Sequence, residues 1–207
     1  VGIETPNSES LNECGKMQNL KRDLVESVNK LQRSGMLVSG GFIVGFDSDT
    51  LGIFQRQIDF IQESGIITAM VGLLQAPYGT QLYARMKKEN RLIDEMSGDN
   101  MDGTSNIIPL MNFQTLHKGY RHILSEIYSP KMLYQRIRTF MKSYQPAIKS
   151  VHLEYCEILA FLKSILKLGI IEKERVEYWK LFFLDSSPFS TKISTGYYSN
   201  HLRLPFP

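Results

Sequence analysis

Two nearly continuous apolar stretches, each followed by a segment with helical periodicity, place the strongest limit on how this chain of 207 residues can fold. The stretches cover residues 37–46 and 66–74. An apolar run without polar alternation indicates a strand that is buried on both faces, as in a parallel sheet. Because a single helix separates one strand from the next, we predict right-handed βαβ units with parallel strands.

The first 110 residues alternate strands and helices throughout. A short apolar strand is predicted over 1–4, before the two longer ones. Periodicity and capping signals predict three helices, over 20–34, from a cap at Asp49 or Thr50 to Gly65, and over 80–89. Three strand–helix units cannot close a barrel, which needs eight. We therefore predict an α/β fold, with half of a parallel (βα) barrel over 1–110.

The charge balance changes sign near residue 110. Residues 1–110 carry 10 Lys+Arg and 14 Asp+Glu, whereas residues 111–207 carry 14 Lys+Arg and 7 Asp+Glu. The second part also has helical character throughout, with helices predicted over 113–128, from Ser129-Pro130 onward, over 151–168 and over 173–184. We therefore predict two units, the second being an all-helical C-terminal domain over 111–207.

The sequence has two cysteines, Cys14 and Cys156. They are too few for a disulfide framework, and they cannot by themselves hold a structural zinc ion or an iron–sulfur cluster. The four histidines lack metal-ligand spacing, so no metal site is predicted within the chain. Low cysteine usage favours a reducing cytoplasm. No apolar stretch is long enough to cross a bilayer.

The first residues, Val1 to Pro6, lack an initiator methionine, a basic segment and a signal-peptide core. Their apolar run is instead typical of the middle of a buried strand. We therefore expect the sequence to be a fragment of a longer protein.

Ligands of parallel α/β folds meet the carboxyl ends of the strands and the loops that follow them. This rule selects three segments, 4–6, 45–49 and 75–78. Glu4 ends an apolar strand, where a carboxylate without a partner is costly. It can accept hydrogen bonds from a ligand ammonium or hydroxyl group. The alternative is a structural salt bridge to a neighbouring strand.

Glycines flank an isoleucine in the second strand. Alternate residues of a strand share a face, so Gly41, Ile43 and Gly45 are expected on one face. They would leave a slot in which a flat ring could lie against Ile43 and bare backbone. The alternative is close packing of a helix on the sheet. For the nearby carboxylate of Asp49, the alternative to a ligand role is the N-cap of the following helix.

Basic and aromatic residues are interleaved between Lys118 and Lys149, with Glu126 as the single acid. The basic residues are Lys118, Arg121, Lys131, Arg136, Arg138, Lys142 and Lys149. Such a segment can bind nucleic acid or an anionic membrane surface, although a solvated helix face is the default interpretation. We therefore keep, as the alternative function, a non-catalytic helical module that binds membrane or nucleic acid through residues 113–149.

Three motifs in order resemble the second half of the radical S-adenosylmethionine barrel. They are Gly2-Ile3-Glu4-Thr5-Pro6-Asn7, Gly40-Gly41-Phe42-Ile43-Val44-Gly45-Phe46-Asp47, and Gly72-Leu73-Leu74-Gln75-Ala76-Pro77 followed by Gly79-Thr80 and Leu82-Tyr83. The resemblance is strongest to the group whose members carry an N-terminal cobalamin-binding domain. The helical remainder resembles the uncharacterised C-terminal domain that often follows the barrel in that group.

The resemblance implies roles for the first two motifs. Glu4 would contact the ribose or the amino-acid part of S-adenosylmethionine. The glycine–isoleucine–glycine pattern of Gly41, Ile43 and Gly45 would pack against its adenine. Asp49 lies near the acidic position that closes this pattern, with aspartate in place of the usual glutamate.

At the third motif, the resemblance implies that the backbone of Gln75 and Ala76 meets the adenine edge, and Tyr78 is a candidate substrate contact at the barrel mouth. No side chain of this chain is expected to act as acid, base or nucleophile, because the cofactors of such enzymes supply the hard chemistry. The implied cofactors are S-adenosylmethionine, a 4Fe-4S cluster and cobalamin.

The family holds its cluster with a Cys-x3-Cys-x2-Cys motif, which these 207 residues lack. The cluster and cobalamin are therefore expected to be ligated by a missing upstream part, and the chain alone is expected to be inactive. Anaerobic reconstitution of the chain with iron and sulfide should give no cluster absorbance near about 400 nm.

We accordingly predict a fragment of a cobalamin-dependent radical S-adenosylmethionine enzyme. It would methylate or otherwise modify an unactivated carbon of a small-molecule or lipid-like substrate. A reductant protein is the expected partner of the parent enzyme, nucleic acid is disfavoured, and peripheral membrane contact is compatible with a lipid substrate. The rival barrel, a phosphate-binding isomerase, would need a glycine-rich loop after a late strand, which is missing.

Overall fold

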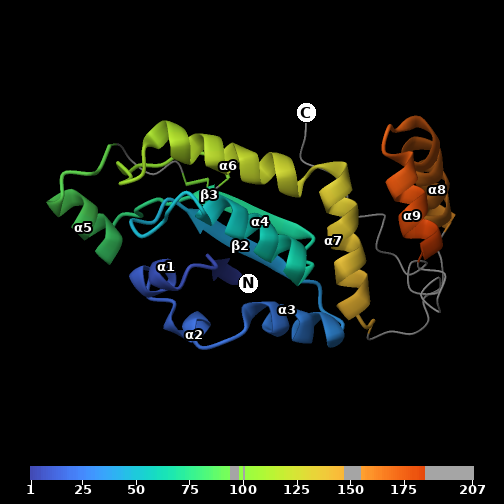
Figure 1. Ribbon diagram of the computed structural model, residues 1–207, viewed down its shortest axis with the longest axis horizontal. Helices are drawn as coiled ribbons and strands as arrows, with labels where there is room; N and C mark the ends of the chain where they lie inside the picture. Colours follow the sequence, from blue (N-terminus) through green and yellow to red (C-terminus); the bar gives the residue numbers. More distant parts are fainter. Residues whose placement is uncertain (94–97, 100, 147–154, 185–207) are drawn as a thin grey trace.

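The computed structural model describes the chain except for residues 94–97, 100, 147–154 and 185–207. Figure 1 shows the elements in chain order: β1 (Gly2–Glu4), α1 (Ser8–Glu13), α2 (Met17–Leu20), α3 (Leu24–Arg33), β2 (Ser39–Val44), α4 (Ile53–Ser64), β3 (Thr68–Leu73), α5 (Gln81–Lys88), α6 (Phe113–Ile127), α7 (Pro130–Ser143), α8 (Tyr155–Ser164), the π-helix η1 (Ile165–Ile171) and α9 (Arg175–Leu184).

Three parallel strands form the sheet, in the order β1-β2-β3. β2 and β3 pair in register from Ser39 with Thr68 to Val44 with Leu73. Helices α3 and α4 lie in the two connections, as the apolar stretches and the helical periodicity between them predict. The α/β class is thereby confirmed. The described residues form a three-stranded parallel sheet and no barrel, so the half barrel over 1–110 stays a prediction.

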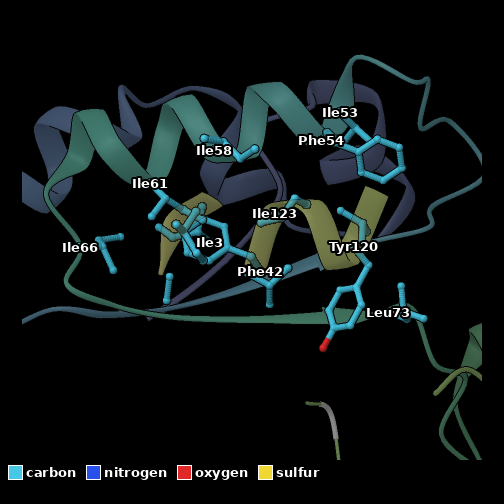
Figure 2. Packing of buried hydrophobic residues seen from close by; sticks show 14 of the residues in the cluster. Ile3, Phe42, Ile53, Phe54, Ile58, Ile61, Ile66, Leu73, Tyr120 and Ile123 are labelled. Carbon is cyan, nitrogen blue, oxygen red and sulfur yellow. The ribbon is translucent and has the colours of Figure 1, made fainter. Parts of the chain in front are cut away.

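One face of the sheet forms the main core together with α3, α4 and α6. The strands contribute buried residues at alternate positions, as the pleat requires; these are Ile3, Phe42, Val44, Ala69, Val71 and Leu73. Figure 2 shows α4 above the strands, with Ile53, Ile58 and Ile61 turned toward them. Tyr120 and Ile123 of α6 reach the same cluster.

Helices α6 and α7 pack onto the α/β unit. Gly119 lets α6 approach α4 closely, because a Cβ at Gly119 would overlap the ring of Phe54. α7 crosses the end of α4 (Figure 1), where Gly65 lies against the backbone of Phe140. The division of the chain at residue 110 stays a prediction. The packing shows that α6, which follows residue 110, completes the hydrophobic core of the α/β unit that precedes it.

The chain between β1 and β2 differs from the prediction in two respects. The helix predicted from residue 20 begins at Leu24, because the side chain of Asp23 accepts a hydrogen bond from the N–H of Glu26 and caps it there. Upstream, α1 and α2 have only six and four residues. A segment that short spans barely one or two turns, so its apolar residues show no helical period.

The helix predicted over 151–168 is described from Tyr155 onward, and it does not end at Gly169. It continues as the π-helix η1, in which Gly169 is a contact point: its carbonyl oxygen accepts a hydrogen bond from the indole N–H of Trp179 at 2.8 Å. A side chain at Gly169 would crowd that ring, so the glycine serves packing on α9 here. None of the described helices is long and apolar enough to cross a membrane.

Candidate functional site

The second face of the sheet carries part of the predicted ligand site. Since Phe42 and Val44 point into the main core, Gly41 and Ile43 point to the other face. Among the described residues, a Cβ built on Gly41 would have one neighbour within 4 Å, the carbonyl oxygen of Val1 at 3.9 Å. The backbone of β2 is therefore open at Gly41.

Apolar side chains border this open backbone. Met70 of β3 pairs in register with Gly41, and its side chain is 43% exposed. Ile43 is half-buried and packs against a second cluster near the carboxyl ends of the strands. That cluster consists of Phe46, Leu74, Ala76, Met86 and Ile107. The open backbone at Gly41 is thus bordered by the apolar side chains of Ile43 and Met70, and a slot that holds a flat ring stays a prediction.

Gly45 does not share this face, contrary to the prediction. β2 ends at Val44, and Gly45 has a φ angle of +103°, which glycine adopts readily. A Cβ at Gly45 would lie 3.1 Å from Cδ2 of Leu116 in α6. The strand alternation stops one residue before Gly45, and this glycine lets a helix pack closely at the strand end, as the alternative interpretation proposed.

Glu4 ends β1 with a φ angle of +67°, a conformation that is rare outside glycine. Its carboxylate pairs with Nζ of Lys16 at 3.0 Å. The alternative interpretation, a salt bridge at Glu4, is confirmed. The partner, however, is Lys16 in the segment between α1 and α2 and not a residue of a neighbouring strand. Both charged groups lie over Gly2, where a Cβ would be 2.6 Å from Oε1 of Glu4 and 3.2 Å from Nζ of Lys16. Since Gly2 pairs with Gly41, the ion pair lies beside the open backbone.

Asp49 braces the loop after β2. One carboxylate oxygen accepts hydrogen bonds from the N–H groups of Gly45 at 2.9 Å and Phe46 at 3.1 Å, and the other accepts from Oγ of Ser10 at 2.8 Å. Burial raises the pKa of Asp49, and these hydrogen bonds oppose the rise in part. The expected N-cap at Asp49 or Thr50 is wrong, because α4 starts without a side-chain cap. A ligand role for Asp49 stays a prediction.

A network of ion pairs ties the same loop to α1 and α5. Asp47 pairs with Arg91 at 2.6 Å and with Arg85 at 3.1 Å. Arg85 also pairs with Glu13 at 2.8 Å, and Glu13 accepts hydrogen bonds from the N–H groups of Asp47 and Ser48 at 3.4 Å each. Glu13 lies 34 residues from Asp47 and 72 from Arg85. No local spacing in the sequence signals such partners.

Asp47→Asn should lower the free energy of unfolding by about 1 to 2 kcal/mol at pH 7, because a partly buried, two-pronged ion pair with Arg91 is lost. The hydrogen bonds from Arg91 hold the pKa of Asp47 below its usual range. Its stabilisation is therefore present above about pH 4 and disappears as the pH falls through the folded-state pKa. Urea denaturation of wild type and variant should show their difference shrinking below pH 4.

The control for this prediction is Asp59→Asn, at an exposed position of α4. It should change stability by at most about 0.5 kcal/mol at either pH. A stability difference for Asp47→Asn that is the same at pH 7 and at pH 3 would contradict the assignment of the loss to the ion pair.

Asn106 holds the chain after β3. Its side-chain amide accepts a hydrogen bond from the N–H of Ala76 at 2.8 Å and donates one to the Ala76 carbonyl at 2.9 Å. The backbone polar groups of Ala76 are therefore engaged within the protein. Nε2 of Gln75 donates to the carbonyls of Asp99 and Thr104. The buried Oε1 of the same side chain has no hydrogen-bond partner among the described residues, which is unusual for a buried acceptor.

Tyr78, the predicted substrate contact, lies on the surface just beyond this strand end. Its side chain is 88% exposed and meets the ring of Tyr83 edge-on, with centroids 5.2 Å apart. Its contact with a substrate stays a prediction.

The basic segment over 113–149 is not a continuous charged surface. Arg136 is fully buried, and Arg138 forms an ion pair with α9. Tyr120 and Phe140, two of the interleaved aromatic residues, are buried as well. Lys149 lies outside the described residues. The interleaved pattern arises in part because α6 and α7 are amphipathic, and their inward faces carry aromatic residues and one arginine.

Within the part of the chain that the structure describes, no three His, Cys, Asp or Glu residues are grouped so that they could hold a metal ion. Cys14 and Cys156 are exposed and form no disulfide with each other. The ligation of a cluster by residues outside this chain stays a prediction.

Comparison with known proteins supplies the context for this geometry. The chain is 33% identical over 183 residues to an uncharacterized methyltransferase of Synechocystis sp. The match covers 86% of this chain and 34% of the relative. It is 31% identical over 136 residues to the hopanoid C-2 methylase of Rhodopseudomonas palustris, covering 66% of this chain and 25% of the relative. It is 31% identical over 94 residues to the bacteriochlorophyllide d C-12(1)-methyltransferase of Chlorobaculum tepidum. This match covers 45% of this chain and 21% of the relative.

The matched part of this chain thus corresponds to about a fifth to a third of the length of each relative. All three relatives are named as methylating enzymes. A family model described as "Domain of unknown function (DUF4070)" matches residues 80–203. Because this match spans more than half of the chain, the chain belongs to the DUF4070 family.

Proposed function

We propose that this chain supplies part of the S-adenosylmethionine-binding face of a radical S-adenosylmethionine methylating enzyme that also uses cobalamin. Three observations support the proposal. The relatives are named as methylating enzymes. The three motifs at the strand ends match the order found in that enzyme class. The observation that carries the proposal is the open backbone at Gly41, beside the Glu4–Lys16 ion pair and at one sheet face.

The residues present fit this ligand. The bare backbone at Gly41, with Ile43 at its edge, matches a flat adenine ring. Glu4 offers a carboxylate to hydroxyl or ammonium groups, and Lys16 offers a cation next to it. A ligand with an aromatic ring, hydroxyl groups and a charged end is complementary to this set.

In such an enzyme, this chain would bind S-adenosylmethionine and orient it. The backbone of β2 and the Ile43 side chain would fix a ring, and Glu4 would fix the polar end of the ligand. The network around Asp47 and Asp49 would hold the loop after β2 in place. When bound, the cofactors supply the radical and methyl-transfer chemistry. The ligands of the 4Fe-4S cluster and of cobalamin would lie outside these 207 residues, and the chain alone would be inactive.

We further propose that the substrate is lipid-like and that an unactivated carbon is methylated. The names of two relatives refer to a hopanoid and to a bacteriochlorophyllide, both of which are polycyclic molecules. This supports a bulky, mainly apolar substrate. A cytoplasmic location, a reductant protein as partner, and peripheral membrane contact remain part of the same proposal.

The proposal is tested at Gly41. In the full-length protein proposed here, Gly41→Val should weaken the binding of S-adenosylmethionine by about tenfold or more, because branched carbons would occupy the space of the ring. The free energy of unfolding should change by less than about 1 kcal/mol, since a Cβ at this position meets open space and valine suits a strand. Isothermal titration calorimetry and urea denaturation measure the two effects.

Thr68→Val is the matched control, because Thr68 lies on the same sheet face at the amino end of β3. It should leave the affinity unchanged. Wild-type protein without saturable S-adenosylmethionine binding would overturn the proposed function. Equal affinity in wild type and Gly41→Val would show that the ligand does not lie on this face.

A further inference from the structure

We infer that the outer surface of α8 and η1 binds an anionic membrane surface. The inference rests on the membrane contact of the proposed function and goes beyond it, because it assigns that contact to one surface outside the basic segment over 113–149. The observation behind it is a row of exposed apolar side chains that two lysines border. The row is called the apolar stripe here and consists of Tyr155, Ile158, Leu159, Leu162, Leu166 and Ile170.

The apolar stripe follows the period of a helix. From Tyr155 to Leu166 its members are three, one, three and four positions apart, a spacing that places side chains on one helix face. In the described structure, all six side chains are between 38% and 76% exposed. A stripe with this spacing normally faces the core of a protein. On α8 and η1 it faces outward instead.

The opposite side of α8 and η1 is already used for packing on α9. The ring of Phe161 stacks on that of Phe182, with centroids 6.1 Å apart, and Oγ of Ser164 shares a hydrogen bond of 3.2 Å with the hydroxyl group of Tyr178. Figure 1 shows α8 and α9 together beyond α7, against which α9 packs. A helix that is apolar on both sides is typical of a buried environment. The apolar stripe therefore calls for an apolar partner.

Positive charge lies at the edge of the apolar stripe. From Ile158 to Ile171 the sequence contains Lys163 and Lys167 and no acidic residue. Both lysines are exposed. Lys163 is four positions after Leu159, so it lies beside the stripe on the helix surface.

An anionic membrane surface matches both features. Apolar side chains can enter the boundary between headgroups and acyl chains, and a helix with an apolar face bordered by lysines lies in the plane of that boundary. The lysine stems can cover apolar surface while their ammonium groups stay among the headgroups. Anionic lipids attract these ammonium groups. The stripe and its lysines would therefore contact the same membrane surface.

A second copy of the chain is the alternative partner, and the charges disfavour it. Two apolar stripes packed on each other would bring Lys163 and Lys167 of one copy close to those of the other. The stretch from Ile158 to Ile171 has no acid to compensate these charges. Like charges placed together across an interface oppose association. Anionic lipid compensates them instead.

The test measures cosedimentation of the 207-residue chain with lipid vesicles. Wild type should bind vesicles of phosphatidylcholine mixed with phosphatidylglycerol more tightly than vesicles of phosphatidylcholine alone, and added salt should reduce the difference. Leu162→Glu combined with Leu166→Glu should weaken binding to the mixed vesicles by at least about tenfold, because carboxylates would have to enter the apolar layer. Lys163→Gln combined with Lys167→Gln should weaken it by about tenfold and remove most of the salt dependence.

Leu110→Glu is the matched control. Leu110 is 67% exposed and lies before α6, in a different part of the chain. Its substitution should leave vesicle binding unchanged. All these variants should unfold at the same urea concentration as wild type, because the side chains that they replace are exposed.

The possible outcomes separate the claims. Wild type that does not bind the mixed vesicles overturns the inference, and so does a leucine double variant that binds them as tightly as wild type. An equal loss in Leu110→Glu overturns it as well. A lipid-free dimer that the leucine double variant abolishes, together with no vesicle binding by wild type, would assign the stripe to a second copy. A protein that binds vesicles but not S-adenosylmethionine overturns the proposed function and leaves this inference standing.

Discussion

Arg136→Met is expected to lower the free energy of unfolding by about 3 to 5 kcal/mol, the largest effect predicted for any single change in this chain. Arg136 is fully buried at the junction of α4, α6 and α7. One guanidinium nitrogen donates to the carbonyl of Ile127 at 2.7 Å and to Oε1 of Gln62 at 2.9 Å. The other donates to the carbonyl of Ile67 at 3.1 Å. Methionine would leave the buried carbonyl of Ile127 and the two partly buried acceptors without this donor.

Burial lowers the pKa of Arg136 to about 10, so the guanidinium remains charged at neutral pH. Within the described part of the chain, its hydrogen-bond partners include no carboxylate. The charge is instead stabilised by the carbonyl at the end of α6 and by the ring of Tyr128, 5.7 Å away. Arg136→Lys should lose about half as much stability as Arg136→Met, because an ammonium keeps the charge without the planar fork.

Arg138→Met is the matched control, two positions along the same helix. Arg138 is 26% exposed and pairs with Glu177 at 3.2 Å, so its loss should lower stability by about 1 kcal/mol or less. Urea denaturation followed by circular dichroism measures all three variants. Equal losses for Arg136→Met and Arg138→Met would show that the buried hydrogen bonds are not what stabilises this junction.

Gly65→Ala is expected to lower the free energy of unfolding by about 3 kcal/mol. Gly65 ends α4 with a φ angle of +68°, where an L side chain is strained by about 1 kcal/mol. The added Cβ would also lie 2.8 Å from the backbone nitrogen and 3.0 Å from the Cα of Phe140. Helix backbone cannot rotate away as a side chain can, so α7 would have to shift, and such overpacking costs about 1 to 3 kcal/mol more.

Gly79→Ala separates the two causes. Gly79 has a φ angle of +80°, but a Cβ there would meet nothing within 4 Å. Its substitution should therefore show the conformational strain alone, about 1 kcal/mol. Urea denaturation of both variants gives the comparison. Losses of the same size at the two positions would mean that the contact between Gly65 and α7 adds nothing.

Local patterns predicted the elements of the fold well where the reason was local. The helix start predicted at Ser129-Pro130 is confirmed, since Ser129 is the N-cap of α7 and its Oγ accepts a hydrogen bond from the N–H of Met132. The apolar runs predicted the positions of β2 and β3 but not their burial on both faces. One face lies in the main core, whereas Thr68 and Met70 on the other face are exposed. The alternation of β2 likewise placed Gly41 and Ile43 on one face.

The same local rules fail where contacts with other parts of the chain determine the conformation or the burial of a residue. Gly45 leaves the expected face because the strand ends one residue earlier, and α6 packs where its side chain would be. Asp49 caps no helix because the backbone N–H groups of its own loop take its carboxylate first. Arg136 counts as surface charge in the sequence and is buried in the fold.

The sequence by itself determined a parallel α/β unit, the three strand ends at which a ligand would meet it, and the absence of a three-cysteine motif from these residues. Only the tertiary structure decided which charges meet there: Lys16 with Glu4, and Arg91 with Asp47. The physical reason is range. Hydrophobic period and capping act between residues a few positions apart, whereas an ion pair depends on where the loops return the chain, which no short stretch of sequence specifies.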